Sequence, residues 1–185
     1  MLQRKRNRLP GFDYSSYSYY FVTVCVHNRL PVLGEYSGKS LVLNEYGIIV
    51  KEKLLSLPKR YLYMEIDEFA IMPNHVHAII IIDPSQKFTS CNDSGMGDHY
   101  TGTSRDLSLQ PACIKIKSLS ELVGAFKTIS SKEIHQSGFK DFRWQRSFYD
   151  HIIRNEKSLY KIRQYIQQNP LRWEIEKDMI ENLEI

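Results

Sequence analysis

Two histidines separated by one valine, His75 and His77, have the residue type and spacing of a metal clamp. Side chains alternate along a β-strand, so positions i and i+2 project from one face, where two imidazoles can reach one cation. The isoleucines at 79–82 are β-branched and indicate that this strand is buried. Pro73 and Asn74 predict a turn just before His75, which would place the pair at the solvated rim of a sheet.

The same spacing also occurs when two histidines simply occupy the polar face of a strand. A third alternating histidine is absent because position 79 is isoleucine, which excludes the nucleotide hydrolases that carry a His-x-His-x-His run. A closed structural zinc site needs two further Cys or His ligands at short spacing, and Cys25, Cys91 and Cys113 are isolated from one another. An open metal site is therefore favoured over a structural zinc site.

A tyrosine and an amide, Tyr165 and Asn169, are four residues apart in a segment with helical periodicity, so they share one helix face. If that face meets the histidine strand, two imidazoles, an amide oxygen and a phenol surround one cation. Mixed nitrogen and oxygen ligands suit Mg²⁺ or Mn²⁺ bound to a phosphate oxygen, with the phenolate attacking phosphorus. Packing beside the apolar stripe would also explain Tyr165, and a helix C-terminus before Pro170 would explain Asn169.

Positive charge gathers in two clusters, although the net charge is only +4. The first cluster is Arg4, Lys5, Arg6 and Arg8, and the second consists of Arg143, Arg146, Arg154, Lys157, Lys161, Arg163 and Arg172. Aromatic residues alternate with the second cluster, a mixture that suits single-stranded nucleic acid because cations neutralise phosphates and exposed rings stack on unpaired bases. A solvated helix face over an aromatic core would give the same composition.

The elements that must position these residues follow from periodicity and from turn residues. We expect strands over 19–27, 61–72, 75–82 and within 142–153, and helices over 40–57, 118–135, 156–169 and 174–185. Ser120 and Asn155 are the expected N-caps, and Pro58 and Pro170 the expected helix stops. The order β-α-β-β-α-β-α predicts an α+β sandwich, an antiparallel sheet with helices packed on one face.

Size and composition predict one domain over 1–185, with a basic N-terminal arm at 1–18 and a polar, flexible insertion at 83–117. Three isolated cysteines favour a reducing compartment. The longest aliphatic stretch, 78–82, is too short to cross a bilayer, and no signal peptide is recognisable. The expected location is cytoplasmic, with no membrane partner.

Four segments together resemble the HUH single-strand tyrosine transposases, most nearly the REP-associated tyrosine transposase branch related to the insertion-sequence 200/605 transposases. They are MPNHVHAI (72–79), LVGAFK (122–127), WQRSFYDHIIRNEKSL (144–159) and YIQQNPLRW (165–173). The resemblance extends from about residue 19 to residue 173. It implies a ferredoxin-like (RRM-like) fold with the HUH motif on a central strand and the catalytic tyrosine on a C-terminal helix.

The resemblance also implies roles for single residues. His75 and His77 would be the HUH metal ligands, Asn169 the third ligand in the place that glutamine fills in some relatives, and Tyr165 the nucleophile. Members of this family cut single-stranded DNA near hairpins, form a 5′-phosphotyrosine bond, release a 3′-OH and rejoin strands. The expected function is thus DNA transposition with Mg²⁺ or Mn²⁺ on hairpin-containing DNA of a bacterial nucleoid. Both single subunits and dimers occur among relatives, which leaves a homodimer open.

The expected DNA contacts are Arg4, Lys5, Arg6, Lys127, Arg143, Arg146, His151 and Arg154. Tyr149 is a rival nucleophile, but it precedes the last helix and lacks an amide four residues on. Two other functions are compatible with the sequence. One is a domesticated, non-catalytic protein that binds DNA or RNA hairpins, and the other is a hydrolase of small phosphoesters that activates water instead of using Tyr165.

Overall fold

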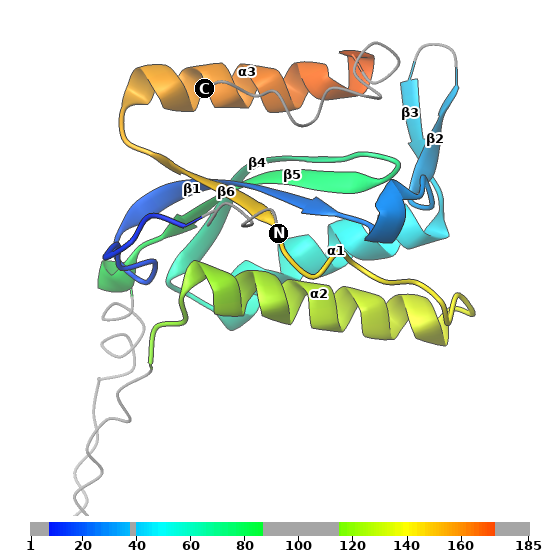
Figure 1. Ribbon diagram of the computed structural model, residues 1–185, viewed down its shortest axis with the longest axis horizontal. Coiled ribbons are helices and arrows are strands. Elements are labelled where there is room, and N and C mark those ends of the chain that lie inside the picture. Colours follow the sequence, from blue (N-terminus) through cyan, green and yellow to red (C-terminus); the bar gives the residue numbers. More distant parts are fainter. Residues whose placement is uncertain (1–7, 38–39, 87–114, 173–185) are drawn as a thin grey trace, which may run out of the picture.

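The fold is built on one four-stranded antiparallel sheet with the strand order β4-β5-β1-β6 (Figure 1). The structure is a computed structural model that describes residues 8–37, 40–86 and 115–172. The strands of the sheet are β1 (Ser18–Cys25), β4 (Met64–Ile71), β5 (His75–Ile82) and β6 (Tyr149–Ile153). The central pair, β1 and β5, is aligned over its whole length, from Ser18 opposite Ile82 to Cys25 opposite His75.

Strand β5 is buried along its whole length, as its isoleucine run predicts. Its alternate residues Val76, Ala78, Ile80 and Ile82 belong to the main hydrophobic core, whereas Ile79 belongs to a second core on the other face. The turn predicted at 73–74 is also confirmed, because the Met72 amide donates to the His75 carbonyl across it at 2.8 Å. A strand with two apolar faces requires cover on both sides of the sheet.

Two helices, α1 (Glu45–Arg60) and α2 (Leu119–Gln136), cover the face of the main core. The order of the sheet strands and these two helices is β-α-β-β-α-β, the arrangement of a ferredoxin-like sandwich. The expected α+β class with an antiparallel sheet is thus confirmed. None of the helices in the described ranges is long and apolar enough to cross a membrane.

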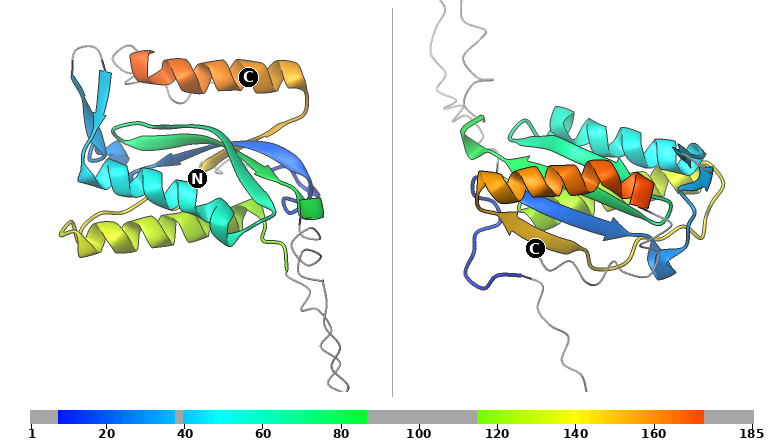
Figure 2. Two further views of the ribbon diagram at one scale, coloured as in Figure 1. Left: turned by 180° about the vertical axis from the view of Figure 1, so that it is seen from behind. Right: turned by 90° about the horizontal axis from the view of Figure 1, so that it is seen from above.

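The expectation that all helices pack on one face is wrong, because α3 (Glu156–Arg172) covers the opposite face (Figures 1 and 2). Its buried residues Ile162 and Ile166 pack with Phe21 and Ile79 in the second core. The cause is the apolar character of both faces of β5, since an amphipathic helix stabilises whichever apolar surface is left uncovered.

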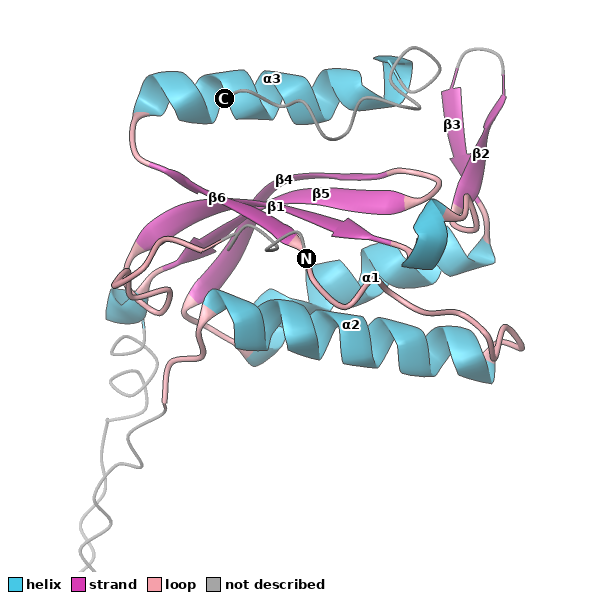
Figure 3. Ribbon diagram, in the orientation of Figure 1, coloured by secondary structure: helices cyan, strands magenta, loops and turns pink. Residues whose placement is uncertain are grey.

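The helix expected over 40–57 begins later, because residues 40–43 form a strand. A hairpin of β2 (Gly34–Ser37) and β3 (Ser40–Leu43) precedes α1 and rises toward the far end of α3 (Figure 3). Asn44 then caps α1, its side-chain oxygen accepting from the amides of Tyr46 and Gly47 at 3.1 and 3.0 Å. Pro58 does not stop α1, which ends at Arg60. Leu57, directly before Pro58, is buried in the main core and holds the last turn against the sheet.

The other helix ends show which capping signals were informative. The cap of α2 is Ser118 and not Ser120, because the Glu121 carboxylate accepts from the Ser118 amide at 2.8 Å in a capping box. Asn155 caps α3 as expected, accepting from the Ser158 amide at 2.8 Å. Pro170 does not stop α3, which ends at Arg172. The segment expected as a last helix, 174–185, and most of the expected insertion lie outside the described residues.

Candidate metal and nucleophile site

Three side chains from two elements meet above the sheet: His75 and His77 from β5, and Tyr165 from α3. The Nε2 atoms of the two histidines are 2.9 Å apart, and the Tyr165 hydroxyl is 3.5 Å from His77 Nε2. The His77 and Tyr165 rings are in edge contact, with centroids 5.3 Å apart. Packing of α3 on the second core therefore brings together residues that are 88 positions apart in the chain.

The outer nitrogen of each imidazole has its own partner. Asn74 donates its amide N–H to the Arg29 carbonyl at 3.1 Å, which turns its side-chain oxygen toward His75 Nδ1 at 2.6 Å. His75 therefore carries its proton on Nδ1 and directs a lone pair from Nε2. His77 Nδ1 is 2.9 Å from the Thr23 hydroxyl, which can accept or donate. Such outer partners fix ring orientation in metal-binding histidines.

The histidine pair fits a divalent cation. The two Nε2 atoms are 2.9 Å apart, which is close enough for both to reach one ion at metal–nitrogen distances of about 2.1 Å. The same separation is that of a hydrogen bond between the two rings. If the pair held a cation, His77 would carry its proton on Nδ1 and donate to Thr23, which would leave both Nε2 lone pairs for the ion. The chemistry of Thr23 permits both states.

The electrostatics keep both imidazoles neutral. His75 and His77 are 1% and 0% exposed. Burial, and then the charge of Arg29, lower the pKa of His75 to about 3, and burial, followed by His75 itself, lowers the pKa of His77 well below its usual value. Neutral imidazole is the form that binds metal. The expectation of a solvated rim is therefore wrong for the histidines, because both are buried and His77 is packed between Phe21, stacked at 5.3 Å, and Tyr165 of α3, in edge contact at 5.3 Å.

Asn169 is buried, at 4% exposed, one helical turn beyond Tyr165. Within the described part of the chain, no three His, Cys, Asp or Glu residues form a group that could hold a metal ion. Among the described residues, Asn169 and Tyr165 on α3 are the side chains that the sequence predicts beside the two histidines. Amide oxygen together with imidazole nitrogen is the donor set that the sequence predicts for Mg²⁺ or Mn²⁺.

Two side-chain contacts fix α3 on either side of Tyr165. Arg163 donates to both carboxylate oxygens of Asp67, at 2.8 and 2.6 Å, and Gln167 donates to Glu68 at 2.8 Å. Asp67 and Glu68 lie in β4 where the pairing with β5 is irregular, between Ile66 and Phe69. The sequence gives no sign of these pairs, because Arg163 and Asp67 are 96 residues apart.

The residues predicted to contact DNA are dispersed over the surface. Lys127, Arg143 and Arg146 line a cavity of about 860 Å³ beside α2. His151 and Arg154 line a separate cavity of about 320 Å³. Arg4, Lys5 and Arg6 lie outside the described residues.

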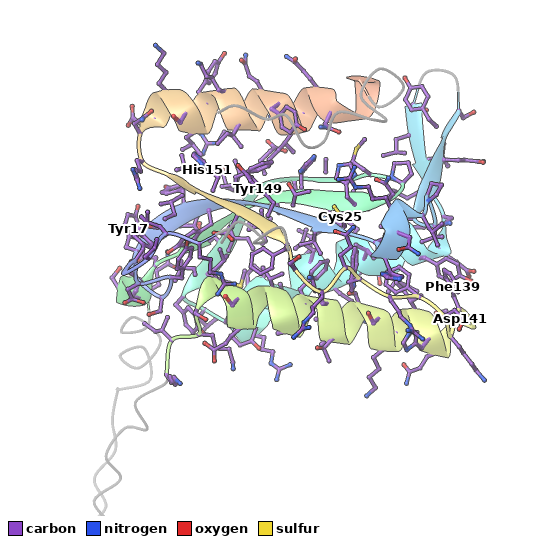
Figure 4. The ribbon with its side chains drawn as sticks, viewed as in Figure 1. Tyr17, Cys25, Phe139, Asp141, Tyr149 and His151 are labelled. Carbon is purple, nitrogen blue, oxygen red and sulfur yellow. The ribbon has the colours of Figure 1, made fainter. Side chains whose placement is uncertain are left out.

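The rival nucleophile, Tyr149, lies on the same face of the sheet as the histidine pair. It is 40% exposed at the start of β6 and packs edge-on against Phe21, with centroids 6.4 Å apart (Figure 4). Its backbone is paired opposite Thr23, the partner of His77. The hydroxyl of Tyr165 thus lies beside a nitrogen of His77. Tyr149 lies on the same face but two strands away from His77, across β1.

Sequence reasoning missed three residues that hold the histidines. The sequence predicts Asn74 only as a turn residue, although its position directly before His75 is a usable signal. Phe21 and Thr23 gave no signal, because each reaches His77 only through the pairing of β1 with β5.

Comparison with known proteins places the chain in a family. It is 35% identical over 176 residues to an "Uncharacterized protein" of Haemophilus influenzae, covering 92% of this chain and 90% of that protein. The chain therefore belongs to the same family as the Haemophilus protein. No protein-family profile matches the chain.

A solved structure supports the fold. The chain is similar to the "REP associates tyrosine transposase bound to a REP hairpin", with a TM-score of 0.53, 20% identity, and coverage of 93% of this chain and 74% of that one. At this level of identity the similarity establishes a shared fold.

Proposed function

We propose that this protein is a transposase-like, metal-dependent enzyme that cuts and rejoins single-stranded DNA beside hairpins, with Tyr165 as the nucleophile. The observation that carries the proposal is the Tyr165 hydroxyl 3.5 Å from Nε2 of His77, whose neighbour His75 is 2.9 Å away. The fold shared with a tyrosine transposase bound to a hairpin supports DNA hairpins as the substrate class.

In this proposal, His75, His77 and Asn169 hold Mg²⁺ or Mn²⁺. When bound, the cation polarises the scissile phosphate and stabilises the charge that develops on it. The protein contributes neutral imidazoles, whose outer nitrogens are held by Asn74 and Thr23, so that little reorganisation is needed when the ion enters.

The chemical step is an exchange of one phosphodiester for another. The Tyr165 oxygen attacks phosphorus, a bond forms between them, and the bond from phosphorus to the 3′ oxygen breaks. The phenolic proton passes to water, and the departing oxygen takes up a proton to become a free 3′-OH. The 5′-phosphate remains on Tyr165 until a 3′-OH attacks it, which rejoins the strands without an external energy source.

The test uses labelled DNA hairpins with single-stranded flanks, incubated with Mn²⁺ or Mg²⁺ and separated on a denaturing gel. We expect a labelled band at the mass of the protein that disappears with a chelator. Tyr165→Phe removes only the attacking oxygen, so adduct formation should fall below detection while hairpin binding persists. Tyr160→Phe is the matched control, because Tyr160 is 62% exposed on the same helix.

Each alternative predicts a different result. An adduct that survives Tyr165→Phe but disappears in Tyr149→Phe would reassign the nucleophile. Cleavage without any adduct would indicate activated water, as in a phosphoester hydrolase. Shifted complexes without adduct or cut, across a broad hairpin panel, would favour the non-catalytic hairpin-binding protein.

A further inference from the structure

The turn that follows β1 contains two residues in an uncommon backbone conformation. Asn28 and Arg29 have φ angles of 54° and 52°, in the left-handed region that residues other than glycine rarely adopt. Within the described part of the chain, they are the two such residues with positive φ. Asparagine tolerates this conformation because its short polar side chain can bond locally, a feature that arginine does not have. Strain of this kind persists only where the surrounding structure holds it, and it gathers at functional sites.

In this conformation, the carbonyl oxygen of Arg29 faces the turn that precedes His75. The side-chain N–H of Asn74 donates to this oxygen at 3.1 Å, although the two residues are 45 positions apart. The backbone of Asn74 is bound by the same loop, because the Val26 amide donates to its carbonyl at 2.8 Å. Asn74 is 7% exposed. Its side-chain amide is therefore held in one orientation by a backbone group, away from exchange with water.

The Arg29 carbonyl also sets the direction of the hydrogen bonds within the site. A backbone carbonyl can only accept, whereas a hydroxyl or a neutral imidazole can donate or accept. Because the Asn74 N–H is turned to Arg29, its side-chain oxygen faces His75 Nδ1 at 2.6 Å, and His75 carries its proton there. His75 Nε2 is then the acceptor in its 2.9 Å contact with His77, and the Thr23 hydroxyl donates to His77 Nδ1.

The opposite orientation of the Asn74 amide would close the pair to a cation. Rotated by half a turn, the amide would present its N–H to His75 Nδ1, and the ring proton would have to move to Nε2. A protonated nitrogen has no lone pair for a metal ion. The same rotation would place the amide oxygen of Asn74 against the carbonyl oxygen of Arg29, where two acceptors repel each other. One backbone carbonyl thus decides which nitrogen of His75 a cation can reach.

We propose that Arg29 is a positioning residue, whose left-handed backbone holds Asn74 and thereby keeps His75 in the tautomer that can bind a cation. The role belongs to the backbone of Arg29 and not to its side chain. Cation binding at this pair rests on the proposed function, whereas the tautomer of His75 is a property of the metal-free protein.

The first test compares Arg29→Gly with Arg29→Val, which remove the same side chain but differ in the backbone conformation that they allow. Equal removal matters because burial, and then the charge of Arg29, lower the pKa of His75. Glycine adopts positive φ without steric cost, and a β-branched residue is strongly disfavoured there. NMR of isotope-labelled imidazole nitrogens in the metal-free protein, with the His75 signals assigned by their loss in His75→Gln, reports the tautomer. We expect the proton on Nδ1 in Arg29→Gly and a shift toward Nε2 in Arg29→Val.

The second test measures metal affinity by calorimetric titration with Mn²⁺. Arg29→Val should bind the ion about 10–100-fold more weakly than Arg29→Gly, the usual loss when an outer partner of a metal ligand is removed. Asn74→Ala should reproduce that loss. Adding Arg29→Val to Asn74→Ala should then cost little more, because both changes break the same chain of hydrogen bonds. Additive losses would mean that Arg29 acts by another route, and would overturn the proposal.

Urea unfolding verifies that the variants are folded, and Arg29→Ala, which opposes positive φ less than valine, should lie between glycine and valine in both readouts. The same His75 tautomer in Arg29→Gly and Arg29→Val would overturn the positioning role, even where the wild type forms a tyrosine adduct. Equal Mn²⁺ affinity of the two variants, where the wild type binds the ion, would also overturn it. A difference in tautomer without Mn²⁺ binding or adduct in the wild type would support the positioning role and refute the proposed enzyme.

Discussion

The two faces of the sheet share their strands but differ in what they bury. The face under α1 and α2 packs a large apolar core, whereas the face under α3 packs a smaller one that ends at His75 and His77. Strand β5 contributes to both, with Ile80 in the first core and Ile79 in the second. The difference shows that one strand can supply stability through alternate residues and a polar site through the others.

The largest effects should come from matched cavities in the two cores. Ile80→Ala and Ile79→Ala remove the same atoms from residues that are 2% and 0% exposed, so each should cost about 2–5 kcal/mol of unfolding free energy. Only Ile79→Ala removes packing beneath α3, because Ile79 shares a core with Ile162 and Ile166. It should therefore also slow adduct formation under conditions where both variants stay folded.

Urea unfolding measures the first quantity and the rate of adduct formation measures the second. Equal rates in the two folded variants would mean that α3 holds Tyr165 without the second core, and the proposed division between the faces would fail.

An intermediate effect should distinguish the ion pairs that join a helix to each face. Asp67→Asn breaks the bidentate pair with Arg163 on α3, and Lys53→Met breaks the pair with Glu133, at 3.2 Å, that joins α1 to α2. Both are partly exposed, so each should cost about 1 kcal/mol or less of stability. Asp67→Asn should in addition lower the maximal rate of adduct formation with little change in hairpin affinity, since Arg163 is two residues from Tyr165.

The exchanged variant, Asp67→Arg with Arg163→Asp, serves as the rescue. Recovery of the rate would support a positioning role for the pair. A rate in Asp67→Asn as fast as in Lys53→Met would show instead that the pair only stabilises the fold.

The smallest effect concerns pH, at the edge of the α2 face. Burial lowers the pKa of Lys127 from 10.5 to about 8, although carbonyl oxygens accept from its ammonium. Between these values the unfolded chain binds more protons than the folded one, so stability should rise with pH across this window. The rise should be smaller in Lys127→Met, and urea midpoints near both ends of the window measure the difference. Parallel curves for the two proteins would show that Lys127 keeps its ordinary pKa in the fold.

Much of the fold was predictable because its signals are local. The isoleucine run of β5, the Pro-Asn turn and the Asn155 cap each depend on neighbours within a few residues. The β2–β3 hairpin was missed because Leu43 fits the helical spacing of the later apolar residues, so that the helix was expected to begin at residue 40. Two signals of a hairpin were present: Leu41 and Leu43 alternate as in a strand, and Gly38 lies between the two strands. The sequence did not predict which face of the sheet α3 covers. An amphipathic pattern shows that a helix has an apolar side, but it does not show which apolar surface that side packs against.

For the candidate site, the sequence by itself determined the chemical types: two imidazoles on one strand face, and a phenol and an amide one turn apart on a helix. Only the tertiary structure decided that His77 and Tyr165 meet, that Thr23 and Asn74 orient the rings, and that both histidines are buried. The physical reason is that periodicity fixes which side chains share a face, whereas distances between faces depend on packing between residues far apart in the chain.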